Sequence, residues 1–259
     1  MIADLVSGPR YLLQGYRLIF RPGLRRFFLI PLLVNVLVFV GLVWLFIDQF
    51  EALLDWLLPT VDSLWAQLAR GLLWFIFAVA ASVFMFFTFT LAANLIAAPF
   101  NGWLAERVAY ALDKNNMPVP TTDVSWLKSV GVSLASELRK LTYLLAMILL
   151  PLIVTFIPII NLLAPLLWLM VTSWLLALEY LAYPLENQGM RFSEVRRYAK
   201  TRRLLSLGFG AAVLLATVVP LVNLAIMPAA VAGATVMWFE RGNHRQAHNM
   251  IPADNSKAV

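Results

Sequence analysis

LTYLLAMILLPLIVTFIPIINLLAPLLWLMVTSWLLAL, residues 141–178, is an uncharged stretch that prolines break near its middle. Residues 204–239 form a second such stretch, and the two breaks share a pattern, PIINL at 158–162 and PLVNL at 220–224. The arms beside each break hold roughly 13–17 residues, or about 20–25 Å of helix, whereas a bilayer core is about 30 Å thick. These lengths predict two Pro-broken helical hairpins that penetrate only part of a membrane.

The asparagine in each break has two interpretations. Asn161 and Asn223 can satisfy backbone groups that a turn leaves free. Non-helical backbone at bilayer depth persists only where protein or water satisfies it. The repeated pattern therefore indicates either a structural repeat that frames a transport path or a convenient turn that occurs twice.

Two other uncharged runs are long enough for complete crossings, each of which needs about 20 residues. They predict transmembrane helices over 24–47 and 71–112. The second run exceeds one bilayer thickness, so we expect its helix to continue into the cytoplasm as far as Leu112.

Shorter polar segments flank these runs. Residues 1–21 carry polar side chains at helical spacing, which predicts an amphipathic helix at the membrane interface that starts near Ser7. The basic segment 193–203 predicts a second amphipathic helix, on the cytoplasmic side. The tail 246–259 is expected to be disordered.

The composition is that of an integral membrane protein. Apolar residues make up 61% of the 259 residues, and the mean hydropathy is +0.80, outside the range of a soluble domain of this size. The predicted fold class is therefore an all-α integral membrane protein, with one membrane-embedded domain over 1–245. The absence of cysteine excludes disulfides, thiolate metal sites and cysteine nucleophiles.

The distribution of charge predicts an orientation. Residues 1–26 hold five arginines and one aspartate, whereas residues 48–70 hold four acidic residues and one arginine. The positive-inside rule then places the N-terminus in the cytoplasm and 48–70 outside. The net charge is +6, but the basic residues flank membrane spans. We therefore expect the lipid bilayer, and not nucleic acid, as their partner.

Arg25 and Arg26 are the first candidate binding residues. They follow Pro22 and Gly23, where one helix stops and the next begins. A helix start presents free N–H groups and the positive end of a dipole, and two guanidinium groups add planar donors that suit an oxyanion. The pattern predicts a small anion site, although paired arginines at the inner end of a first span are also common topology signals.

A second candidate group lies along the second crossing. It comprises two asparagines in an otherwise apolar helix and the charged pair that closes the uncharged run: Asn94, Asn101, Glu106 and Arg107. A polar stripe on one helix can line a water path. The alternative is hydrogen bonding between helices together with an interfacial salt bridge.

No catalytic apparatus is visible in the sequence. Nucleophile-elbow, zinc-protease, Walker and dinucleotide-binding motifs are all absent. His244 and His248 are spaced by four residues but have no third ligand nearby, so they predict no metal site. We therefore expect neither enzyme activity nor a cofactor.

Three short segments resemble the bacterial CysZ sulfate permeases: RPGLRR at 21–26, APFN at 98–101 ahead of Glu106, and LAYPLENQG at 181–189. The resemblance extends over about residues 8–245 and includes the order of the hydrophobic segments. It implies an all-helical fold with two full transmembrane helices and two hairpins that enter only part of the bilayer.

The resemblance also implies a function and its residues. It implies sulfate uptake across the bacterial inner membrane, channel-like or proton-coupled, by a multi-pass protein that forms homo-oligomers and supplies sulfur for cysteine biosynthesis. The family's sulfate-binding Gly-Leu-Arg motif is matched by Gly23, Leu24, Arg25 and Arg26. Polar residues that line or gate the family's path are matched by Asn94, Asn101, Glu106 and Arg107. The alternative function is a membrane scaffold, or a regulator of another permease, that transports nothing itself.

Overall fold

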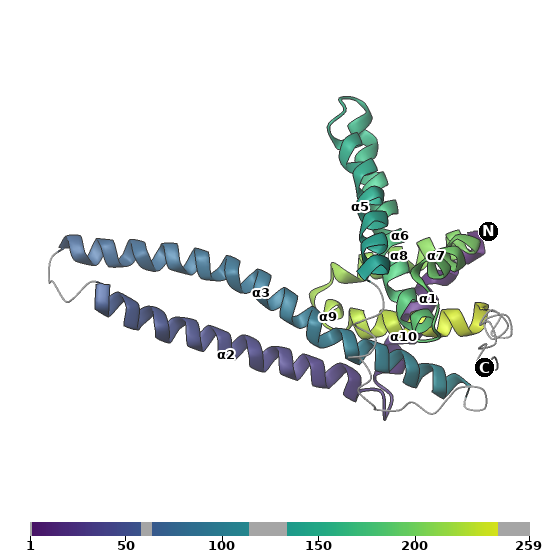
Figure 1. The fold of residues 1–259 in the computed structure, drawn as a ribbon, viewed down its shortest axis with the longest axis horizontal. Helices are drawn as coiled ribbons and strands as arrows, with labels where there is room; N and C mark the ends of the chain where they lie inside the picture. The colour runs from purple at the N-terminus through teal and green to yellow at the C-terminus, as the bar shows by residue number, and fades with distance from the viewer. Residues whose placement is uncertain (1, 58–63, 114–133, 243–259) are drawn as a thin grey trace, which may run out of the picture. The chain divides into compact units, whose positions relative to one another are not determined.

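The computed structural model describes residues 2–57, 64–113 and 134–242, and every regular element in these ranges is a helix (Figure 1). This confirms the all-α prediction. The longer helices are α1 (Ile2–Ile19), α2 (Arg26–Leu57), α3 (Leu64–Leu112), α5 (Leu134–Thr155), α6 (Ala164–Glu186), α7 (Phe192–Thr201), α8 (Arg203–Thr217) and α10 (Ile226–Arg241). Two short elements are η1 (Ile160–Leu163) and α9 (Pro220–Asn223). The expected tail and the two histidines lie outside the described residues.

Three stretches of the described chain are long and apolar enough to cross a membrane: Arg26–Phe50, Gln67–Thr88 and Ile160–Glu186. The first two correspond to the predicted transmembrane helices. The third contains the second arm of the first hairpin, because α6 continues to Glu186 whereas the prediction ended this arm at Leu178. The arm is therefore longer than its uncharged run, and partial penetration of this hairpin stays a prediction.

The chain divides into two compact units, which are described separately. Unit 1 comprises Met1–Phe27 and Asn101–Val259, and unit 2 comprises Phe28–Phe100. Helix α3 contributes to both, since the boundary falls within it. The single membrane-embedded domain expected over 1–245 stays a prediction.

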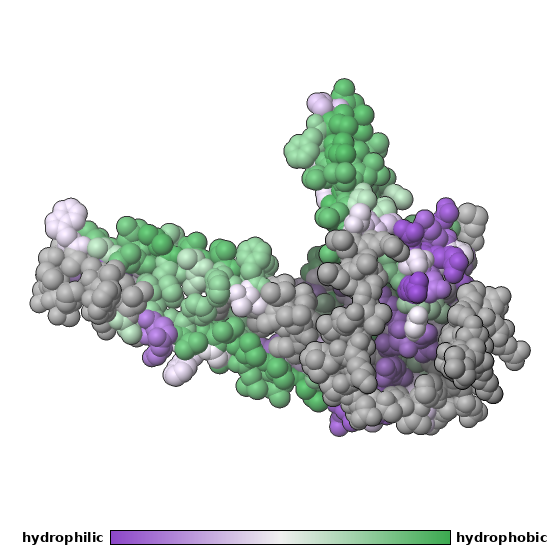
Figure 2. Space-filling model, in the orientation of Figure 1, coloured by the Kyte–Doolittle hydropathy of each residue, from purple (hydrophilic) through white to green (hydrophobic). Residues whose placement is uncertain are grey.

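Unit 2 consists of α2 and the first part of α3, which lie side by side (Figure 1). Aromatic rings join them: the ring centroids of Phe50 and Phe77 are 3.5 Å apart in a stacked arrangement, and Trp74 meets Phe50 edge-on at 4.5 Å. The outward side chains are largely apolar (Figure 2), and Trp44 is 70% exposed. Helices that expose so much apolar surface are suited to lipid rather than to water.

The core of unit 1 forms around α10, which packs against α1, α6 and α8. Residues 228–238 of α10 are all buried. Small residues allow this close approach: a Cβ added to Gly233 would lie 2.5 Å from the Tyr11 carbonyl oxygen of α1, and one added to Gly15 would overlap the Ala229 carbonyl of α10. Such contacts between backbones are typical of helices that pack inside membranes.

Helix α1 begins at Ile2, so the predicted start near Ser7 is wrong. Pro9 lies inside the helix, and its ring nitrogen cannot donate to the Leu5 carbonyl. That carbonyl instead lies against Gly208 of α8, where only a glycine leaves room for it. The contact with α8 therefore accommodates the proline, and the apolar side of α1 covers α8 and α10.

The two hairpins share one backbone bond at their tips. In the first hairpin (α5, η1 and α6) the Asn161 N–H donates to the Ile157 carbonyl at 2.9 Å. In the second (α8, α9 and α10) the Asn223 N–H donates to the Val219 carbonyl at 2.8 Å. In each hairpin the chain turns at the proline, and the backbone N–H of the asparagine donates across that proline.

Candidate functional site

The Gly23–Arg26 segment forms a tight turn between α1 and α2. The N–H groups of Leu24 and Arg25 donate to the Arg21 carbonyl, at 3.1 and 3.2 Å. Gly23 has φ +89°, and a Cβ placed there would meet nothing within 4 Å. This backbone conformation favours glycine, and it leaves one side of the turn open to an approaching ligand.

Within this turn the side chains divide by exposure. Leu24 is 8% exposed and anchors the turn, whereas Arg25 and Arg26 are exposed. The Arg26 guanidinium lies 4.9 Å from the centroid of the Phe27 ring. Neither arginine forms an ion pair with a carboxylate of the described chain. Their positive charge is therefore available to an anion.

The amides at the start of α2 contribute less than the sequence suggested. The Arg25 N–H already donates to Arg21, and the Phe27 N–H donates to the Leu24 carbonyl at 3.0 Å. The helix begins at Arg26 rather than at Leu24. The two guanidinium groups are consequently the principal donors that this turn offers to an oxyanion.

The second candidate group is divided between the two units. Asn94 belongs to unit 2, and the other three residues belong to unit 1. Asn101 is 3% exposed, on the buried face of α3 with Leu104. A helix turns by about 100° per residue, which places Glu106 about 140° from Asn101. Glu106 and Arg107 therefore do not share the face of Asn101.

Glu106 lies beyond the Gln67–Thr88 span and is half-buried. Burial raises the pKa of its carboxyl group, and the neighbouring charge of Arg107 opposes part of that rise. A carboxyl group with a raised pKa exchanges its proton closer to neutral pH. Among the four residues, Glu106 is thus the one suited to proton transfer.

Two of the three family-like segments meet in unit 1. The Asn187 side-chain N–H donates to the Gly102 carbonyl at 2.9 Å, and the Asn101 side chain lies close to the Tyr183 hydroxyl. This hydrogen bond joins the segment at 181–189 to α3 at Gly102, the residue directly after the segment at 98–101. The Nδ2 atom of Asn101 is buried without a partner in the described chain.

The C-terminal end of α6 requires a glycine at position 189, the last residue of the segment at 181–189. Gly189 has φ +77°, its N–H donates to the Glu186 carbonyl at 2.8 Å, and the Met190 N–H donates to the Leu185 carbonyl at 3.1 Å. These two bonds form a Schellman motif with glycine in its left-handed position. The motif fixes Asn187 where its side chain reaches α3.

The family described as "Sulfate transporter CysZ/Etoposide-induced protein 2.4" matches residues 11–228. The chain belongs to this family. The match includes the Gly23–Arg26 turn and the hydrogen-bonded contact between α3 and α6, so the resemblance read from the three short segments is confirmed.

Individual members of the family are similar over nearly their whole length. The sulfate transporter CysZ of Pseudomonas syringae pv. tomato is 42% identical over 246 residues, which cover 93% of this chain and 96% of that protein. The protein of the same name from Pseudomonas fluorescens (strain Pf0-1) is 40% identical over 256 residues, covering 97% and 99%. That of Pseudomonas aeruginosa (strain PAO1) is 39% identical over 240 residues, covering 93% and 97%.

Tyr183 and Asn187 were missed as candidate residues. Their segment, LAYPLENQG, was noticed only as a family-like motif, and both residues come from a part of the chain distant in sequence from Asn101. The signal that was present is the polar Glu-Asn-Gln-Gly end of an otherwise apolar helix. That signal predicts a helix end, but not the helix that the end contacts.

Proposed function

We propose that this chain transports sulfate across the bacterial inner membrane as a multi-pass protein and thereby supplies sulfur for cysteine biosynthesis. Membership of the family and the names of its Pseudomonas members support the substrate. The three stretches able to span a membrane support the location. Transport rather than catalysis fits a sequence in which no catalytic motif is visible.

The sulfate site of this proposal is the Gly23–Arg26 turn. The observation that carries it is the pair of exposed, unneutralised guanidinium groups beside a glycine with an open face. Planar N–H forks match the oxygens of a tetrahedral dianion, and charge-assisted bonds are about twice as strong as neutral ones. Exposure to water keeps the binding moderate, which a transported ion needs in order to leave.

The route beyond this site uses the polar residues of α3 in our proposal: Asn94, Asn101, Glu106 and Arg107. The orphaned Nδ2 of Asn101 supplies a donor, and the raised pKa of Glu106 permits coupling to protons. Asn94 lies in a different unit from the rest. We propose that a homo-oligomer completes the path.

The test is uptake of radiolabelled sulfate by liposomes that contain the purified chain alone. We expect Arg25→Ala/Arg26→Ala to lower uptake at least about tenfold, because each charge-assisted contact contributes about 1.5–3 kcal/mol. The matched control is Arg10→Ala/Arg17→Ala, which removes two exposed arginines of α1.

Each result has a definite meaning. If both double variants lose sulfate uptake equally, the loss follows from the lower net positive charge of the chain, and the turn is not the sulfate site. No uptake by the unmodified chain would favour the scaffold or regulator instead. An inward proton gradient that accelerates uptake in the unmodified chain, but not in Glu106→Gln, would establish coupling through that residue.

A further inference from the structure

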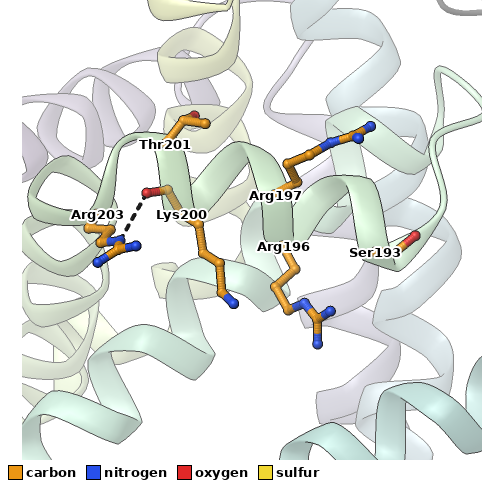
Figure 3. A pocket seen from close by; sticks show the side chains of 6 residues that line it. All are labelled: Ser193, Arg196, Arg197, Lys200, Thr201 and Arg203. Atoms are coloured by element: carbon orange, nitrogen blue, oxygen red, sulfur yellow. Dashed lines mark hydrogen bonds between the residues drawn. The ribbon is translucent and has the colours of Figure 1, made fainter.

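A basic hollow of about 530 Å³ lies along α7 and the start of α8 (Figure 3). Four cationic and two hydroxyl-bearing residues line it: Ser193, Arg196, Arg197, Lys200, Thr201 and Arg203. Together we call these residues the α7 hollow. It lies far along the sequence from the Gly23–Arg26 turn, and the proposed route for sulfate does not use it.

The positive charge of the α7 hollow is only weakly neutralised. Glu194 is the one carboxylate on α7, and one of its oxygens lies 3.7 Å from the Arg197 guanidinium. Its other oxygen accepts a bond from the Arg191 N–H at 2.8 Å. Asp4 lines an adjoining hollow that shares Lys200 and Arg203. Four cations thus face two carboxylates that already have partners.

Two of the four cations, Arg196 and Arg203, have contacts that hold their side chains in place. Val195 and Ala199 are fully buried, which turns the basic face of α7 outward. The Arg196 guanidinium lies 4.8 Å from the centroid of the Tyr143 ring. Arg203 donates through Nε to the Lys200 carbonyl at 3.2 Å, at the corner between α7 and α8 (Figure 3). Binding an anion here therefore requires little further ordering of Arg196 and Arg203.

The α7 hollow lies beside the ends of two apolar helices, α6 and α8. Helix α7 connects α6, whose apolar span ends at Glu186, with α8, whose uncharged run starts at Leu204. Leu204 and Leu205 line the adjoining hollow beside Arg202 and Arg203. Figure 2 shows the hydrophilic residues of this region gathered at the base of the apolar α5–α6 hairpin. Lipid phosphate groups occupy this level of a bilayer.

We propose that the α7 hollow binds the headgroup of an anionic phospholipid through its phosphodiester. Arginine forks and a lysine satisfy the phosphate oxygens, and the two hydroxyl groups suit a glycerol headgroup. The adjoining leucines suit the start of an acyl chain. A free oxyanion offers the same oxygens, but only a lipid is concentrated at this level and also presents an apolar part. The proposal is independent of sulfate transport.

The test uses the full chain, stripped of lipid in a neutral detergent, and measures its unfolding temperature with added phosphatidylglycerol. A ligand that binds only the folded state raises that temperature. We expect phosphatidylglycerol to raise it and phosphatidylcholine not to do so. Arg197→Gln/Lys200→Gln should weaken the apparent affinity for phosphatidylglycerol by roughly five- to thirtyfold, given the contribution of each basic residue near a lipid surface.

The control and the competing ligands decide the outcome. Arg10→Gln/Arg17→Gln removes the same charge from exposed positions of α1 and should leave the affinity unchanged. Inorganic sulfate and inorganic phosphate are the other probes. The proposal is overturned if either ion raises the unfolding temperature as much as phosphatidylglycerol does and Arg197→Gln/Lys200→Gln abolishes that rise. It is also overturned if phosphatidylcholine stabilises the chain as well as phosphatidylglycerol does, or if both double variants lose affinity equally. All these readouts are free of transport, so failure here leaves the sulfate proposal standing.

Discussion

The first hairpin, α5–η1–α6, exposes its tip, the described part of α5 and the start of α6, whereas the second, α8–α9–α10, buries one arm almost completely. At the first tip Phe156 is 77% exposed and Leu162 is 81% exposed. The second tip is equally open, with Leu221 82% exposed, but residues 228–238 behind it are buried. Similar Pro-x-x-Asn-Leu patterns therefore occur in different surroundings, and the side chains of the arms decide which helices cover them.

The physical difference lies in side-chain size. α6 begins APLLWLMV, and large apolar side chains of this kind hold neighbouring helices apart and leave surface for lipid. α10 contains PAAVAGAT, whose small side chains let α1 approach to backbone contact. The bulky arms of the first hairpin thus leave apolar surface that suits lipid, and the small residues of the second hairpin let protein cover it.

The largest expected effect comes from filling the contact between α1 and α10. Gly233→Ala places a Cβ 2.5 Å from the Tyr11 carbonyl oxygen, where backbone must shift. We expect a loss of about 3 kcal/mol in the free energy of unfolding, as for severe overpacking. Gly41→Ala in α2 is the control, since its Cβ meets nothing within 4 Å and should be neutral or slightly stabilising. Thermal unfolding in detergent measures both, and equal stability of the two variants would contradict protein coverage of the second hairpin.

Much of this fold was predictable from the sequence because uncharged length, proline position and charge are local properties. The helical class and the two long helices followed from them. The coverage of α10 by α1 could not be predicted in this way, because an amphipathic helix at a membrane interface and one packed on protein have the same periodicity. The small residues of AAVAGA at 229–234 were the available signal, and they point to close helix contact rather than to lipid.

The next largest effect on stability tests how deeply each hairpin tip enters the bilayer. Leu162→Arg and Leu221→Arg each place a charge on a highly exposed apolar tip. If both hairpins enter the bilayer, each variant should lose about 2 kcal/mol of stability in lipid nanodiscs, because arginine in hydrocarbon costs about 2.5–3.5 kcal/mol before it reaches toward the interface. Unfolding in nanodiscs of matched lipid composition provides the comparison. A loss confined to Leu162→Arg would show that only the first hairpin penetrates.

A smaller effect concerns strain at the first tip. Ile159 has φ +70°, which is unfavourable for a β-branched residue. Ile159→Gly should therefore stabilise the protein by about 1 kcal/mol. Leu221 holds the equivalent position in the second pattern but lies in helical α9, so Leu221→Gly should destabilise by a similar amount. Opposite signs in thermal unfolding support the difference, and two losses would refute strain at Ile159.

The candidate site was predictable in part for a comparable reason. The turn at Gly23–Arg26 is a contiguous segment, so its residues are visible together in the sequence. The contact of Asn101 and Gly102 with Tyr183 and Asn187 joins segments about 85 residues apart. Only the tertiary packing of α3 on α6 creates it, and no local pattern encodes a partner at that distance.

The smallest expected effect on stability comes from removing one side-chain hydrogen bond at each hairpin. The Tyr16 hydroxyl of α1 donates to the Val222 carbonyl at 2.5 Å, at the second tip. Within the first hairpin, Trp174 donates to the Tyr143 hydroxyl at 2.9 Å. Tyr16→Phe and Tyr143→Phe should each cost about 1 kcal/mol. Only Tyr16→Phe should speed hydrogen exchange at the backbone of Leu224, because it alone detaches the second tip from α1.

The same bond predicts a dependence on pH. Burial raises the pKa of Tyr16 above its ordinary value of 10.0, so the unfolded chain loses this proton first as pH rises. The contribution of Tyr16 to stability is therefore complete below about pH 10 and declines above it. Subtracting the unfolding free energy of Tyr16→Phe from that of the unmodified chain removes the titration of the other tyrosines. That difference should shrink as the pH rises above about 10, and a constant difference would mean that the hydroxyl is not buried against the second hairpin.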